Sequence, residues 1–75
     1  MQNFTATFKD GTTRTRESDQ DLTHAVKIQY ADGTTQTIFA ARRSELVKEI
    51  KLDREFAPAD YEGAEIEIVE LDVAL

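Results

Sequence analysis

Carboxylates and a single histidine are the side chains in this sequence whose types and spacing come nearest to a metal site. Asp19, Asp21 and His24 lie close together in the chain and are all of types that bind divalent cations. The group lacks a fourth ligand, however, and its spacing does not match a calcium-binding loop. We therefore interpret this segment as a solvated connector and predict neither a metal site nor a cofactor.

Acidic side chains recur in the C-terminal segment at Glu62, Glu65, Glu67 and Glu70. Glu65 and Glu67 alternate with isoleucines, so we expect them on the outward face of a strand, where nothing raises a carboxyl pKa toward catalytic use. One interpretation is a solvated face that prevents edge-to-edge pairing. The other is an acidic stripe that imitates a row of phosphates in a partner's basic groove. On the second interpretation, these four residues form a partner-binding surface.

Two apolar side chains are added to this predicted surface. Tyr61 follows Pro58 in a connector, where it either anchors an interface or packs beneath the end of a helix. Ile38 is the one large apolar side chain that we expect on the outer face of its strand, and together with others it would mark a contact patch.

The sequence lacks the combination of residues that nucleophilic catalysis usually requires. The chain has no cysteine, and His24 is the only histidine available as a base. Neither Ser18 nor Ser44 lies in a nucleophile elbow, and two of the three glycines are taken up by turns, which leaves no phosphate-binding loop. We predict that the protein is not an enzyme.

The elements that would position these residues begin with two hairpins. Segments 8–15 and 30–37 share the sequence Asp-Gly-Thr-Thr, flanked by apolar and threonine-rich runs. Asp-Gly predicts a two-residue type I′ turn, in which both central residues have positive φ. The resulting register pairs Phe8 with Thr13, Ala6 with Thr15, Thr7 with Arg14, Val26 with Phe39 and Lys27 with Ile38.

A helix and a last strand complete the predicted fold. Segment 42–51 places Leu46, Val47 and Ile50 on one helical face. Segment 64–73 alternates but changes parity near Val69, which indicates either a bulge or burial of both faces. The order ββββαβ predicts a single α+β domain over residues 1–75, with an antiparallel sheet of about five strands and one helix on its apolar face. The expected core comprises Phe4, Phe8, Val26, Ile28, Tyr30, Phe39, Leu46, Ile50, Ile66 and Ile68.

The charge balance narrows the class of partner. A formal net charge of −6 opposes direct nucleic-acid binding, which depends on lysine and arginine contacts to phosphates. It favours a basic protein partner, such as one that itself handles nucleic acid, or else serves only solubility. No apolar run approaches the ~20 residues of a membrane span, and the first residues lack the pattern of a signal peptide. We expect a cytoplasmic protein that binds no membrane.

Segment 4–16, followed by Leu22-Thr23-His24-Ala25, resembles small open reading frames of phages and prophages. Short, acidic, cysteine-free proteins of this kind are similar in character to anti-CRISPR and other anti-defence inhibitors. The resemblance implies a phage-encoded inhibitor in the host cytoplasm that binds a nucleic-acid-handling effector complex. It carries over no catalytic residue. The alternative is a self-associating accessory module that forms a homodimer through the last strand and the apolar ending 73–75.

Overall fold

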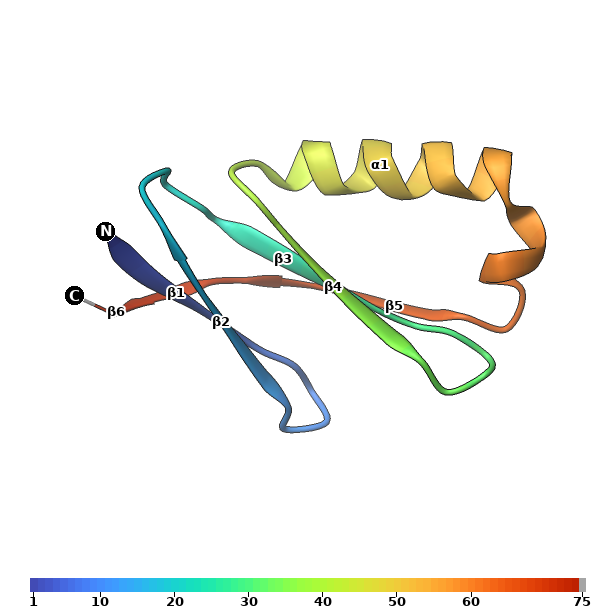
Figure 1. Ribbon diagram of the computed structural model, residues 1–75, viewed down its shortest axis with the longest axis horizontal. Coiled ribbons are helices and arrows are strands. Elements are labelled where there is room, and N and C mark those ends of the chain that lie inside the picture. Colours follow the sequence, from blue (N-terminus) through green and yellow to red (C-terminus); the bar gives the residue numbers. More distant parts are fainter. Residues whose placement is uncertain (75) are drawn as a thin grey trace.

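The computed structural model describes residues 1–74 and has an α+β architecture, as predicted. The strands are β1 (Gln2–Thr7), β2 (Thr13–Ser18), β3 (His24–Gln29), β4 (Thr35–Ala40), β5 (Glu65–Glu70) and β6 (Asp72–Ala74). Helix α1 spans Arg43–Phe56, and the 3₁₀ turn η1 spans Pro58–Tyr61. The predicted single sheet is wrong, because the strands of residues 1–74 form two antiparallel three-stranded sheets, β2-β1-β6 and β4-β3-β5. Figure 1 shows α1 along one side of the second sheet and the β1–β2 hairpin away from the helix, near the two ends of the chain.

The two hairpin loops differ from the prediction by one residue. Phe8 N–H donates to the Thr12 carbonyl at 2.9 Å, and Tyr30 N–H donates to the Thr34 carbonyl at 2.8 Å. Each loop therefore has three residues, and only its glycine has positive φ, at 89° and 91°. This is a type I turn followed by a left-handed glycine, and the predicted type I′ turn is wrong.

The aspartate of each loop explains why the three-residue loop forms in place of the type I′ turn. Asp10 Oδ1 accepts hydrogen bonds from both the backbone N–H and the hydroxyl of Thr12, at 3.0 and 2.7 Å. Asp32 makes the same pair of bonds with Thr34, at 2.9 and 2.6 Å. These bonds to the residue two positions on stabilise the turn while the aspartate keeps a negative φ.

The extra loop residue shifts the second strand of each hairpin by one position, which turns its side chains to the opposite face. Val26 pairs with Ile38 rather than Phe39, so Ile38 contacts the helix-side core and Phe39 the other face. In the first hairpin Arg14 pairs with Ala6, so Arg14 shares the inner face of that sheet instead of the outer one.

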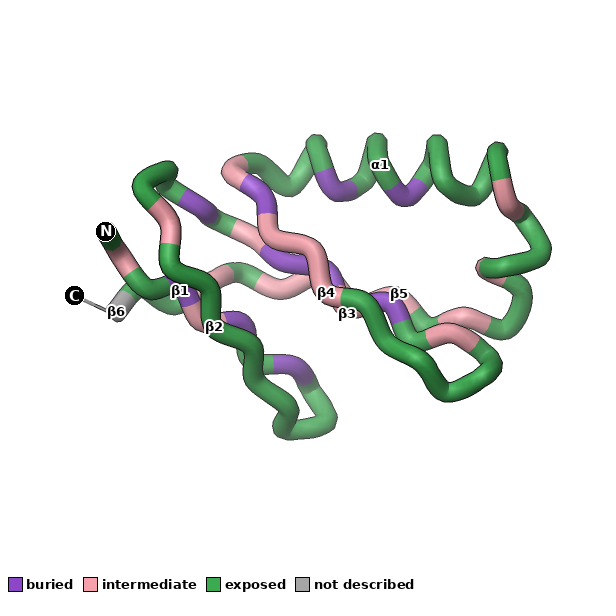
Figure 2. Tube along the Cα trace, in the orientation of Figure 1, coloured by how far each residue is buried: buried purple, intermediate pink, exposed green. Residues whose placement is uncertain are grey.

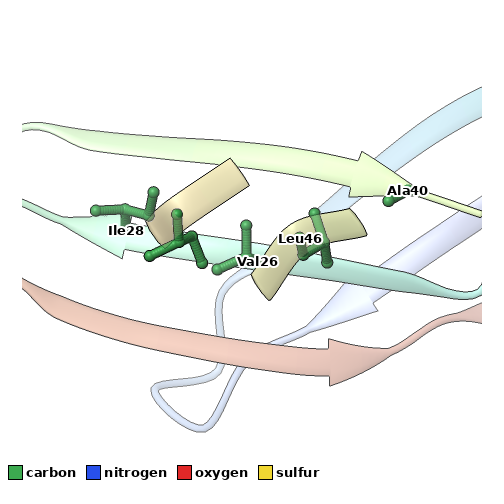
Figure 3. Close-up of a cluster of buried hydrophobic side chains, with 5 residues drawn as sticks. Val26, Ile28, Ala40 and Leu46 are labelled. Atoms are coloured by element: carbon green, nitrogen blue, oxygen red, sulfur yellow. The ribbon is translucent and has the colours of Figure 1, made fainter. Parts of the chain in front are cut away.

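The larger core lies between α1 and the sheet β4-β3-β5. Leu46 and Ile50, one helical turn apart, pack on Val26 and Ile28. Figure 3 shows Val26, Ile28 and Leu46 of this core, with Ala40 at one end. The predicted helix face is confirmed for Leu46 and Ile50, whereas Val47 is 43% exposed.

A second, smaller core lies on the opposite face of the same sheet. Ala6 and Phe8 of the first hairpin pack against Ala25, and Phe39, Val69 and Leu71 contact this cluster. The final strand therefore contributes to both cores: Ile66 and Ile68 contact the helix-side cluster, and Val69 and Leu71 the hairpin-side cluster. Of the two predictions for this strand, burial of both faces is the correct one. The molecule thus has three layers, which are the helix, the central sheet and the first hairpin with β6.

Candidate binding surfaces

The predicted acidic surface is divided between two faces of β5. Glu65 and Glu67 pair with Gln29 and Lys27, on the face that carries the first hairpin. Glu70 has the opposite parity in the strand, and Glu62 is exposed in the turn before it. The structure therefore brings Glu65 and Glu67 onto one face but does not align all four carboxylates in one row.

Glu67 already has a structural contact, which the sequence did not indicate. Its Oε2 accepts a hydrogen bond from the backbone N–H of Lys9 at 2.9 Å, and the residue is half-buried. This bond joins β5 to the loop of the first hairpin. The prediction of an outward, fully solvated face fits Glu65, which is exposed, but not Glu67.

Tyr61 packs beneath the helix end. Its ring makes an edge contact with Tyr30, with centroids 5.9 Å apart, and its hydroxyl donates to Asp53 Oδ2 at 3.3 Å. The guanidinium of Arg54 lies 5.6 Å from the centre of the same ring. Burial, followed by the nearby Tyr30 and Asp53, raises the pKa of Tyr61 to about 12. Of the two fates predicted for this residue, packing is the one observed.

Ile38 is not on the outer face where the sequence analysis placed it. It pairs with Val26 and contacts the helix-side core, because the three-residue loop shifts its strand by one position. The exposed apolar side chains are found on α1 instead, where Phe56 is 88% exposed and Leu52 45%. The predicted helical segment, 42–51, ends before these residues. Exposed aromatic rings are typical anchors of protein interfaces.

His24 and its acidic neighbours do not form a metal site. Thr23 Oγ1 lies 2.7 Å from His24 Nδ1, and the same hydroxyl donates to the Ala41 carbonyl at 2.8 Å. Within residues 1–74, no three His, Cys, Asp or Glu side chains gather closely enough to hold a metal ion.

A charged contact joins the first hairpin to the central sheet. Lys27, on β3, forms an ion pair with Asp10 and donates to Thr12 Oγ1 at 3.2 Å. Its ammonium nitrogen also lies 5.5 Å from the centre of the Phe8 ring. The hydrogen bond from Lys27, together with the two from Thr12, holds the pKa of Asp10 far below its usual range. We call this group, Lys27 with Phe8, Asp10 and Thr12, the interlayer contact.

Strand edges face one another across an opening between the two sheets. β2 and β4 each end their sheet, and two hollows lie between them. The first hollow is lined by Arg14 together with Thr35 and Thr37, and the second by Arg16 together with Phe39. We call this feature, whose lining includes those five residues, the β2–β4 opening. This opening was not predicted, because the predicted register put both arginines on the other face.

No family model, curated protein or solved structure matches this chain. Among residues 1–74, no helix has the length and apolar character needed to cross a membrane.

Proposed function

We propose that the protein is a non-enzymatic, stoichiometric inhibitor that binds a basic protein surface. The observation that carries this proposal is the group of exposed carboxylates around β5, in a chain whose net charge is −6. The target is a host nucleic-acid-handling effector complex, and the inhibitor is phage-encoded and anti-CRISPR-like. Acidic side chains on a rigid sheet edge compete with phosphates for the lysines and arginines of such a target.

The exposed carboxylates differ in how far they are available to a partner. Glu62, in the turn before β5, and Glu65, its first residue, are exposed, whereas Glu67 is already bonded to Lys9 N–H. Glu70 is exposed at the other end of the strand, on the other face. We therefore assign the main electrostatic contact to Glu62 and Glu65. Phe56, exposed at the end of α1, supplies the large apolar side chain that protein interfaces commonly use.

A tagged pull-down tests this proposal. The tagged chain is incubated with nuclease-treated lysate from bacteria that carry defence systems, and retained proteins are identified and quantified by mass spectrometry. We expect one nucleic-acid-handling complex at stoichiometric yield, released by salt because surface charge pairs are screened. Recovery of the tagged chain alone would contradict the proposal.

Charge-reversed variants locate the contact. The double variant Glu62→Lys/Glu65→Lys reverses two exposed charges without breaking the bond from Lys9 to Glu67. The matched control Asp19→Lys/Glu49→Lys makes the same change in net charge at exposed positions away from β5. We expect the first variant to lose the complex and the control to retain it. Equal losses would mean that net charge alone is responsible.

Self-association through the last strand is a second candidate. It is favoured by Val73, which is 49% exposed, and by the position of β5 at the edge of its sheet. Part of the apolar ending on which it was predicted, Leu75, lies outside the described residues. Light scattering on the purified chain tests this candidate, and a monomeric mass at high micromolar concentration would exclude it.

A further inference from the structure

Strand β2 is far less covered than the other strands of the two hairpins. Five of its six residues are exposed, and only Ser18 is half-buried. Figure 2 shows the exposed colour along nearly the whole strand, whereas all but one of the residues of β3 are buried or half-buried. β2 pairs with β1 on one side and ends its sheet on the other. Both its faces and one edge are therefore open to a partner.

The direction of the backbone groups on this edge follows from the loop. Phe8 and Thr12 form a hydrogen-bonded pair, and such pairs alternate along an antiparallel ladder. The next bonded pairs are therefore Ala6 with Arg14 and then Phe4 with Arg16. The backbone N–H and C=O groups of Thr13, Thr15 and Glu17 consequently point away from β1, toward the free edge.

The side chains on β2 give this edge a chemical preference. Arg14 and Arg16 share one face of the strand and line the β2–β4 opening. Within residues 1–74 the only ion pair is that of Lys27 with Asp10, so neither guanidinium group forms an ion pair with a described carboxylate. On the opposite face Thr15 Oγ1 lies 3.1 Å from Thr5 Oγ1. The next pair on this face, Thr13 with Thr7, also consists of threonines.

We propose that the free edge of β2 is a strand-addition site for an extended protein segment with acidic side chains at alternate positions. The segment pairs with the backbone of Thr13, Thr15 and Glu17 and places its carboxylates beside Arg14 and Arg16. Cross-strand pairs of opposite charge favour this arrangement, and main-chain hydrogen bonds supply the rest of the affinity. The added strand covers the β2–β4 opening. This site is separate from the acidic surface around β5 and does not depend on the function proposed above.

A synthetic peptide provides the test. The probe is the octapeptide (Glu-Thr)4 with both ends blocked, and its matched control is (Lys-Thr)4. Backbone amide spectra of the ¹⁵N-labelled chain are recorded during titration with each peptide. We expect (Glu-Thr)4 to shift the amides of β2 and slow the exchange of those of Thr13, Thr15 and Glu17, and (Lys-Thr)4 to do neither. No shift with (Glu-Thr)4, or shifts confined to β5, would overturn the proposal.

Two comparisons distinguish the contribution of the main-chain hydrogen bonds to peptide binding from that of the arginine charges. Thr15→Pro removes one outward N–H and leaves the ladder to β1 intact, while Thr15→Ala removes the same hydroxyl but keeps the N–H. We expect the proline variant to lose binding of (Glu-Thr)4 and the alanine variant to retain it. Arg14→Glu/Arg16→Glu should weaken that binding by roughly tenfold or more and favour (Lys-Thr)4. The unchanged spectrum of the helix-side core serves as the check on folding, and binding that survives both the proline and the charge reversal would refute the site.

Discussion

The two hairpins share the sequence Asp-Gly-Thr-Thr and the same loop geometry but occupy different environments. In the second, Val26 and Ile28 of β3 are fully buried, and α1 and the first hairpin cover opposite faces of the strand. In the first, Phe4 and Ala6 of β1 and Phe8 just after it are buried, while β2 is almost wholly exposed. The difference shows that loop chemistry determines the local register, whereas the neighbouring layers determine which strand becomes core.

Ile28→Ala is the change for which we expect the largest effect. The side chain is fully buried in the helix-side core, so its loss leaves a cavity and should lower the free energy of unfolding by about 3 kcal/mol. Thr13→Ala on β2 is the comparison and should change it by less than about 0.5 kcal/mol, because that residue is exposed. Urea denaturation of both variants measures the difference. Similar losses would mean that β2 is part of the cooperative core.

Gly33→Ala and Gly11→Ala impose the same strain on the two loops. Both glycines have φ near +90°, and nothing lies within 4 Å of an added Cβ, so the effect is conformational rather than steric. We expect each substitution to lower the stability of its own hairpin by about 1 kcal/mol.

Hydrogen exchange distinguishes the two glycine variants. Gly11→Ala should accelerate exchange chiefly in β1 and β2, because the first hairpin can open while the central sheet persists. Gly33→Ala should accelerate exchange throughout the central sheet. Uniform acceleration by Gly11→Ala would show that the first hairpin does not open separately.

The two loop aspartates, Asp10 and Asp32, should contribute differently to the loss of folding stability at acid pH. The hydrogen bond from Lys27 adds to those from Thr12 in lowering the pKa of Asp10, whereas the pKa of Asp32 is lowered chiefly by its bonds with Thr34 and by no lysine. A lowered folded-state pKa stabilises the fold above the ordinary aspartate pKa of about 4, and this stabilisation is lost as the pH falls further. We expect Asp10→Asn to flatten the dependence of stability on pH below 4 more than Asp32→Asn does. Equal flattening, measured by urea denaturation at several pH values, would argue against the interlayer contact.

Tyr61→Phe tests the helix end, where we expect the smallest effect. The pKa of Tyr61 is raised to about 12, so its neutral form stabilises the fold below pH 10, and this contribution is lost as the pH rises through 12. Absorbance at the wavelength of tyrosinate should show a late step near pH 12 that the variant lacks. A wild-type titration with no such late step would contradict the packing described for this ring.

The sequence predicted much of the fold because its signals are local. Apolar residues at helical spacing identified Leu46 and Ile50, and both Asp-Gly hairpins are present. The register was missed because Asp-Gly occurs both in two-residue turns and in three-residue loops. Here the hydrogen bonds that Asp10 accepts from Thr12 and Asp32 accepts from Thr34, two positions on in each loop, stabilise the longer loop.

The division into two sheets and the binding surfaces depend on contacts that local patterns do not contain. The bond from Lys9 to Glu67 and the ion pair of Lys27 with Asp10 each join residues distant in sequence. The register determines which side chains of β2 lie on each face. Because the loop was predicted with one residue too few, Arg14 was predicted on the wrong face of the strand. Ile38 was misplaced for the same reason, whereas Tyr61 was placed correctly by one of its two predicted alternatives.

The pairing of β1 with β6 joins the beginning of the described chain to its end. Asn3 pairs with Ala74 and Thr5 with Asp72. The edge of β1 that faces away from β2 therefore has no partner in its sheet until β6 has been synthesised. During synthesis, the β3–β4 hairpin and α1 can associate before β1 has paired with β6. We therefore expect the first hairpin to be the last part of the molecule to become fixed, and folding to be slow for a chain of this size, because contacts between distant residues close late.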